Sequence, residues 1–303
     1  MSKRWYQENR RDPWRRQAKS KGYRARSAYK LKQIQEKFEV IREGDTILDL
    51  GCHPGGWTQV SVEESGEEGQ IICVDVKSTS PVEGASIIQG NITHAETIER
   101  IVGLLDGREL NVVLSDISPK LTGRYDTDQA ISLELSTMTL DVAMDMLAPG
   151  GSFVTKIFQG VGIEGLIQAA KDRFSNVQRF APMASRNSSS ETYLVCRNRL
   201  PVPRKSARGM SAFAQVQKHL TAVGVNVDDP DEGGDENIAI GFRRITKKDC
   251  LLYTSDAADD SLRLILGANH PSTNKNFILV AQSPNHPTSA LYQFATATLY
   301  LLP

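Results

Sequence analysis

The stretch Asp49–Trp57, DLGCHPGGW, decides the fold of this 303-residue chain. It closes the apolar run Asp45–Leu50, which predicts a buried strand, and a glycine-rich loop follows at the carboxyl end of that strand. Glycines let a backbone approach a ligand closely, and the helix expected from Trp57 onward favours negative charge at its N-terminus. Ligands bind at the carboxyl ends of strands in open α/β sheets, so the stretch predicts a ligand site there.

The spacing of the glycines narrows the choice of ligand. The loop lacks the spaced GxGxxG of a dinucleotide site, which disfavours NAD. The carboxylate of a methionine group suits the N-terminus of the following helix, so we expect S-adenosylmethionine as the cofactor. The residues expected to hold it here are Asp49, Gly51, Pro54, Gly55, Gly56 and Trp57. His53 has no metal-ligand pattern beside it, so we interpret it as part of the loop and expect no metal.

Two polar residues after the next strands are further candidates for cofactor contacts. Asp75 ends the run Gln70–Val76 and could accept hydrogen bonds from both ribose hydroxyls. Asn91 follows a third short strand, and its amide could read an adenine edge. A helix cap or turn is the alternative for Asp75, although its spacing from the glycine loop favours ribose binding. For Asn91 a turn is an equally good interpretation.

Short apolar runs alternate with helical patterns between Gly44 and Arg197, which predicts an α/β sheet with helices on both faces. The expected strands are Asp45–Leu50, Gln70–Val76, Ala85–Gln89, Leu110–Asp116, Gly151–Phe158, Val177–Ala181 and Glu191–Arg197. The expected helices are Ser27–Phe38, Trp57–Glu64, Ala95–Leu105, Asp128–Leu147 and Ile163–Phe174. Ser27 is the expected N-cap of the first helix, and Ala148–Gly151 the expected stop after the fourth.

The formal net charge of zero conceals a basic N-terminus. Residues 1–32 hold 12 Lys and Arg against two acidic residues, with Trp and Tyr between them. Cations contact phosphates and aromatic rings stack on bases, so we expect residues 1–22 to bind RNA; a disordered basic leader is the alternative. The four cysteines show no paired spacing, and no apolar run is long enough to span a membrane. We therefore expect a cytoplasmic protein.

The chain changes character after about residue 200. Residues 201–249 predict a linker, a short helix around Ala212–Ala222 and an acidic loop. From Cys250 the sequence resembles translated sequencing-adapter read-through, so we interpret residues 250–303 as foreign to the fold; a genuine irregular tail is the alternative.

Four charged residues lie in or beside apolar runs, where an unpaired charge is costly. They are Lys30, Asp116, Lys156 and Glu191. Taken singly, each could be a surface ion pair. Together, and beside the cofactor loop, they suggest transfer of a methyl group to a poorly acidic hydroxyl.

The chain resembles the FtsJ-like ribosomal RNA 2′-O-methyltransferases of the large-subunit methyltransferase E type, from about Arg15 to Arg197. The motifs that carry the resemblance follow in the family's order: Tyr23–Leu31, Asp49–Trp57, Ser115–Pro119, Lys156–Gly160, and Ser185 through Tyr193. The resemblance implies a Rossmann-like, seven-stranded, mostly parallel sheet with one antiparallel strand in residues 23–200. It maps the family's Lys-Asp-Lys-Glu tetrad onto the four charged residues. Asn91 departs from the Asp that relatives often carry.

The resemblance also implies a mechanism. Lys156 is the expected base for the ribose hydroxyl. Burial and the nearby cation of Lys30 would favour its neutral form, and the carboxylates of Asp116 and Glu191 would oppose it. Asp116 and Glu191 would orient the lysines, with Asp116 also beside the sulfonium of the cofactor. The residues expected to hold RNA phosphates are Arg24, Arg26 and Arg186.

The expected substrate is a uridine ribose in large-subunit ribosomal RNA, with the large ribosomal subunit as partner and a monomeric enzyme. A methyltransferase for the anticodon loop of transfer RNA is the enzymatic alternative, because the tetrad concerns only the hydroxyl. An RNA-binding ribosome-assembly factor without catalysis is the third possibility, which the intact tetrad disfavours.

Overall fold

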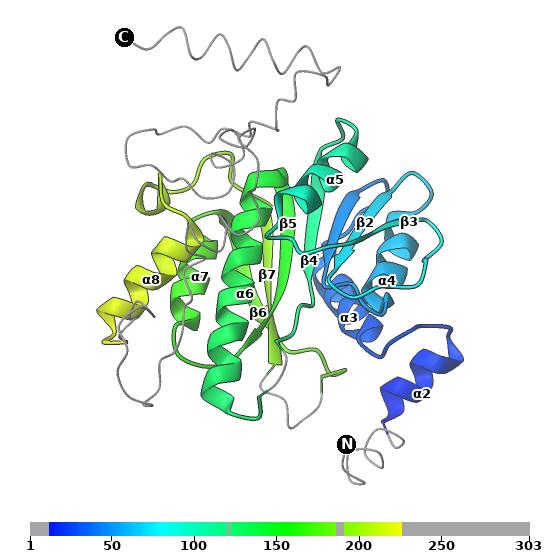
Figure 1. The fold of residues 1–303 in the computed structure, drawn as a ribbon, viewed down its shortest axis with the longest axis horizontal. Coiled ribbons are helices and arrows are strands. Elements are labelled where there is room, and N and C mark those ends of the chain that lie inside the picture. Colours follow the sequence, from blue (N-terminus) through cyan, green and yellow to red (C-terminus); the bar gives the residue numbers. More distant parts are fainter. Residues whose placement is uncertain (1–11, 120–121, 186–190, 226–303) are drawn as a thin grey trace, which may run out of the picture.

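The computed structural model describes residues 12–119, 122–185 and 191–225. They form a seven-stranded sheet with the order β3-β2-β1-β4-β5-β7-β6, flanked by helices (Figure 1). The strands are β1 Thr46–Leu50, β2 Gln70–Asp75, β3 Ala85–Gln89, β4 Leu110–Ser115, β5 Leu147–Phe158, β6 Phe174–Phe180 and β7 Glu191–Arg199. β7 is antiparallel to both of its neighbours and the other pairs are parallel. The predicted sheet with one antiparallel strand is confirmed.

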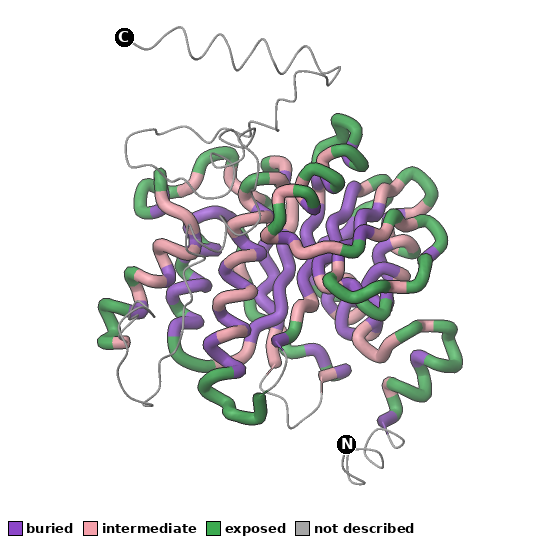
Figure 2. The backbone as a smooth tube through the Cα atoms, viewed as in Figure 1, coloured by how far each residue is buried: buried purple, intermediate pink, exposed green. Residues whose placement is uncertain are grey.

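Helices cover both faces of the sheet. They are α2 Pro13–Ser20, α3 Ala28–Phe38, α4 Gly56–Ser65, α5 Ala95–Leu105, α6 Tyr125–Met146, α7 Ile163–Lys171 and α8 Ala212–Ala222, with a short 3-10 helix, η1 Lys205–Ala207. Apolar residues of α3 and α4 pack on one face, and those of α5 to α8 pack on the other. Every residue of β1 is buried, as in a parallel strand covered on both sides (Figure 2).

Some details of the elements differ from the predictions. The residues Ala148–Gly151 belong to β5, where the pairing with β4 shifts register between Leu110 and Val112 and so accommodates the extra residues as a bulge. The helix expected to reach Phe174 ends at Lys171, because Phe174 begins β6 and stacks on Phe153 at a centroid distance of 6.3 Å. Ser27 occupies the N-cap position of α3, but its side chain makes no capping bond.

A helix that was not predicted, α2, precedes the methyltransferase-like motifs. The Asp12 carboxylate caps it by accepting from the backbone N–H groups of Trp14 and Arg15, at 3.0 and 3.2 Å. Ala18 is buried, and the Trp14 ring packs on Tyr29 of α3 with centroids 5.3 Å apart. Part of the predicted leader is therefore an ordered helix docked on the main body; residues 1–11 lie outside the described part of the chain.

The predicted short helix at Ala212–Ala222 is α8, and it belongs to the core. Its apolar side chains are buried with those of α6 and α7: Ala212, Val216 and Leu220. The Asp141 carboxylate of α6 accepts from the first two N–H groups of α8, at 2.6 and 3.0 Å. The packed body thus continues to residue 225, beyond the predicted boundary at 200; the acidic loop and residues 250–303 lie outside the described residues.

Candidate active site

The side chains that converge at the carboxyl edge of the sheet share the face covered by α3 and α4. Successive strand residues point to opposite faces, so Asp116 lies on the same side as Leu114, which packs against that face. Lys156 and Tyr193 are directly paired across β5 and β7, and they project on that side as well. β7 runs antiparallel, so its first residue, Glu191, is brought to the edge where the parallel strands end.

The four charged residues form two ion pairs. Lys156 Nζ donates to the Asp116 backbone oxygen at 2.9 Å and to Asp116 Oδ1 at 3.2 Å. Lys30 Nζ is paired with Glu191 Oε1. All four side chains are largely enclosed, with exposed fractions between 5% for Lys156 and 17% for Asp116. The structure therefore brings the predicted tetrad together as two adjacent, mutually neutralising pairs.

Tyr193 connects the two pairs and was not predicted as a site residue. Its hydroxyl donates to Asp116 Oδ1 at 2.8 Å and lies 3.4 Å from Glu191 Oε1, and its ring is fully buried. Burial, followed by the charges of the two carboxylates, raises the pKa of Tyr193 well above its ordinary value. Tyr193 is thus a hydrogen-bond donor at neutral pH. Its position two residues after Glu191 on a strand was the available signal, because such residues share a face.

Asp116 is held in its charged form. Burial would raise the pKa of Asp116, but the charges of Lys156 and Lys30 and the hydrogen bonds from Tyr193 and Lys156 outweigh it. The pKa therefore lies below its ordinary value. Glu191 also accepts from the Ser185 hydroxyl at 3.0 Å, next to the segment 186–190 outside the described residues.

The glycine loop brings the end of β1 against the end of β4. A Cβ at Gly51, whose φ is +76°, would lie 2.6 Å from Ile117 Cγ1, so only glycine permits this approach. α4 begins at Gly56, one residue earlier than predicted. The Trp57 ring is buried, donates from Nε1 to Ser27 O at 2.9 Å, and lies 5.5 Å from the Tyr193 ring. Only its backbone could therefore face a cofactor, while its ring joins the loop to the charged pairs.

Asp49 lies beneath this loop with an unsatisfied oxygen. Its Oδ2 accepts from Thr58 Oγ1 at 2.7 Å, whereas its fully buried Oδ1 has no hydrogen-bond partner among the described residues. Burial, with the charges of Asp116 and Asp75, raises the pKa of Asp49 to about 7. A glycine cradle above a buried, unpartnered acceptor fits a ligand that carries a cationic or N–H group.

Asp75 is the last residue of β2 and Asn91 follows β3, and both side chains already accept hydrogen bonds from backbone N–H groups. Asp75 accepts from the N–H groups of His53 and Lys77, at 2.9 and 2.8 Å. Asn91 Oδ1 accepts from Thr93 N at 3.1 Å, the turn given as the alternative. Each Asp75 oxygen keeps a second lone pair, so the turn contacts and a ribose contact are compatible.

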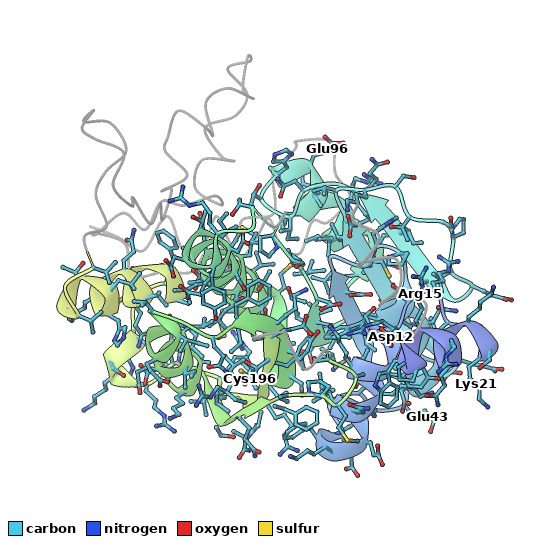
Figure 3. The ribbon with its side chains drawn as sticks, turned by 90° about the horizontal axis from the view of Figure 1, so that it is seen from below. Asp12, Arg15, Lys21, Glu43, Glu96 and Cys196 are labelled. Carbon is cyan, nitrogen blue, oxygen red and sulfur yellow. The ribbon has the colours of Figure 1, made fainter. Side chains whose placement is uncertain are left out.

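The three arginines predicted to bind phosphates have different surroundings. The Arg24 guanidinium donates to the carbonyl oxygens of Pro54 and Ser80, at 3.3 and 2.5 Å, and of Pro81. Arg26 is paired with Asp12 at the start of α2. Arg186 lies outside the described residues. Arg15 and Lys21 belong to the same N-terminal part, at one side of the molecule, as Figure 3 shows.

Neither a metal cluster nor a membrane helix is found in the part of the chain that the structure describes. No group of three or more His, Cys, Asp or Glu side chains is arranged there to hold a metal ion. No helix in the same residues has the length and apolar character needed to cross a bilayer.

The sheet order, the glycine loop after β1 and the charged pairs at the carboxyl edge define a Rossmann-like transferase. The sequence model of the FtsJ-like methyltransferases matches residues 23–199, more than half of the chain. The protein therefore belongs to the FtsJ-like methyltransferase family.

The chain matches named relatives over most of their length. The chain is 46% identical over 195 residues to the "Ribosomal RNA large subunit methyltransferase E" of Methanothrix thermoacetophila, covering 64% of this chain and 75% of that protein. It is 39% identical over 196 residues to the protein of the same name from Marinobacter nauticus, covering 65% and 95%. A crystal structure from Plasmodium falciparum, provisionally named a ribosomal RNA methyltransferase, superposes with a TM-score of 0.54 at 28% identity, over 59% of this chain and 99% of that one.

Proposed function

We propose that the protein transfers a methyl group from S-adenosylmethionine to the 2′-hydroxyl of a uridine ribose in large-subunit ribosomal RNA. The observation that carries the proposal is the pair of ion pairs, Lys30–Glu191 and Lys156–Asp116, enclosed beside the glycine loop. The names of the relatives from Methanothrix and Marinobacter support the choice of RNA. The protein would act as a cytoplasmic monomer on the large ribosomal subunit, without a metal.

The residues that would hold the donor are those of the glycine loop with Asp49, Asp75 and Asn91. S-adenosylmethionine supplies a methyl group already activated on a positively charged sulfur. The acceptor is the weaker reactant, because a ribose hydroxyl is a poor acid and a poor nucleophile. What the chain must supply is therefore alignment of the hydroxyl and a place for its proton.

Lys156 is suited to take that proton. Its Nζ already donates to two oxygens of Asp116, at 2.9 and 3.2 Å, and a neutral amine that donates both of its hydrogens keeps one lone pair. The proton of the hydroxyl would pass to that lone pair while the oxygen–methyl bond forms and the sulfur–methyl bond of the donor breaks, which leaves S-adenosylhomocysteine. The resulting ammonium would stay paired with Asp116, at 3.2 Å from Oδ1.

Labelling of RNA tests the proposal. Purified large ribosomal subunits and naked transfer RNA are each incubated with the protein and methyl-labelled S-adenosylmethionine, and the labelled site is mapped. We expect label on ribosomal RNA at a uridine whose 3′-phosphodiester resists alkali, the mark of a 2′-O-methyl group. Label on a base, or on transfer RNA alone, would contradict the proposal.

A further inference from the structure

Arg24 lies where two loops of the cofactor site meet. Its Nη1 donates to Pro54 O in the glycine loop and to Ser80 O in the loop between β2 and β3, and its Nη2 donates to Pro81 O in that second loop. One guanidinium therefore joins the two chain segments that frame Asp75. The planar group, with N–H donors fixed in a fork, is suited to hold several carbonyls in one geometry.

The glycine loop is shaped around this arginine. Gly55 has a φ of +111°, and a Cβ there would lie 3.0 Å from Arg24 Nη1 and 3.1 Å from Val82 Cγ2. A side chain at position 55 would therefore compete with the arginine for the same space. The need for glycine here comes from Arg24 and Val82 as well as from the backbone conformation.

The backbone around Arg24 is attached to the same unit. Arg24 N donates to Gln59 Oε1 at 2.9 Å, and Gln59 Nε2 donates to Gly22 O at 3.0 Å. Gln59 belongs to α4, the helix that begins at the glycine loop. The segment 22–24 is thus bonded to the loop, to its helix and to the facing loop.

We propose that Arg24 is a positioning residue for the methyl donor, which it serves by fixing the glycine loop against the loop at 80–81. The inference rests on the proposed use of S-adenosylmethionine. It gives Arg24 a role different from the phosphate contact predicted from the sequence, because three of its five N–H groups are already used on carbonyls. A link from the His53 ring to Ser78 O, at 3.2 Å, would remain without it, so the loops would loosen rather than separate.

Binding of S-adenosylhomocysteine, the demethylated donor, tests this role without any RNA. Calorimetric titration of Arg24→Ala should show affinity reduced roughly tenfold, the loss expected for about one charge-assisted hydrogen bond. Arg24→Lys keeps the positive charge but not the forked set of N–H donors, so its affinity for S-adenosylhomocysteine should lie between those of the wild type and Arg24→Ala. Arg16→Ala removes an exposed cation of α2 and should leave this affinity unchanged. Filter binding of RNA across salt concentrations is measured on the same variants.

The outcomes separate the inference from the proposed function. Unchanged affinity for S-adenosylhomocysteine in a folded Arg24→Ala protein would overturn the inference, and weaker RNA binding in that protein would assign Arg24 to a phosphate instead. If thermal unfolding shows that Arg24→Ala does not fold, Arg24→Lys decides, and wild-type affinity there overturns the role. Failure of the wild-type protein to bind S-adenosylhomocysteine would overturn the proposed donor itself.

Discussion

Asp49 and Asp116 stand at the ends of neighbouring strands, yet their environments are opposite. Asp49 is fully buried, with one oxygen on Thr58 and the other without a partner among the described residues, and its pKa is raised to about 7. Asp116 holds Lys156 and Tyr193, and its pKa is lowered. The half of the site proposed to hold the cofactor carries an electrostatic cost, whereas the half proposed to face the acceptor has its charges paired.

The difference teaches how the two halves would be used. A group that must receive part of a ligand gains from keeping an open acceptor, since the ligand then relieves a cost that the protein already carries. Groups that move a proton gain from being fixed before the substrate arrives, because no reorganisation is then needed during the reaction. We infer that the groups around Asp49 contribute binding energy for the donor. The groups around Asp116 would contribute to the rate of methyl transfer.

Among these variants, removal of the Lys156 side chain should have the largest effect, a loss of methyl transfer. Lys156→Ala should lower methyl transfer by about 10²–10⁴-fold, the usual contribution of a general base, and leave S-adenosylhomocysteine binding nearly unchanged. Lys156→Arg is the matched control. It keeps a positive charge beside Asp116, but its guanidinium stays protonated at neutral pH and so cannot accept a proton from the hydroxyl. Single-turnover rates on ribosomal subunits measure both variants, and near-normal transfer by the arginine variant would remove Lys156 as the base.

Asp49→Asn tests the cost carried by the cofactor half. The folded pKa of about 7 lies above the ordinary value of 3.8, so Asp49 stabilises the fold in its neutral form. That stability is fully present below about pH 4 and is lost as pH rises through 7. Asn does not ionise, so the free energy of unfolding of Asp49→Asn relative to wild type should rise by a few kcal/mol between pH 4 and 8. Denaturant titrations at several pH values measure it, and a constant difference would contradict the raised pKa.

Asp75→Ala should weaken binding of the donor. Loss of a charge-assisted bond to a ribose should reduce donor affinity by roughly 1.5–3 kcal/mol. Because Asp75 also accepts from His53 N and Lys77 N, part of this loss comes from the loops. Glu83→Ala, an exposed acid on the same loop, is the control for a change of charge. Calorimetry with equal affinities for the two variants would mean that the ribose is held elsewhere.

Tyr193→Phe removes a single hydroxyl and should have the smallest effect of these variants. The variant keeps the ring against Trp57 but removes the donor to Asp116 and the contact with Glu191. We expect about 1 kcal/mol less stability, a transfer rate reduced by about tenfold, and unchanged donor binding. A rate equal to that of wild type would reduce Tyr193 to a packing residue.

The sequence predicted the sheet well because its strands are short apolar runs bounded by turn residues. It missed the bulge in β5, since Pro149 and two glycines are typical of a turn, and only the pairing with β4 shows that the strand continues through them. It also missed α2, although Asp12 followed by Pro13 is a regular start for a helix. Basic composition there concealed the local signal.

The sequence named the four charged residues that the structure brings together, but not the contacts between them. Lys30 and Glu191 are 161 positions apart, and their motifs placed both in the site before any geometry was known. Composition could not show which arginine side chains are already bonded to other groups of the protein. Arg26 is paired with Asp12 and Arg24 is bonded to three carbonyls, and both partnerships depend on the folded arrangement.

The docking of α8 has a practical consequence for experiments that dissect the chain. A fragment that stops at Arg199, where the match to the family ends, would uncover the apolar surface beneath Val216 and Leu220. It would also remove the bonds of the buried Arg173 to Met210 O and Gln215 Oε1 and leave its bond to Ala169 O, and each lost hydrogen bond to a charged group typically costs about 1.5–3 kcal/mol. Expression plasmids for the catalytic body should therefore encode the protein at least through residue 225, because shorter products would be prone to aggregate.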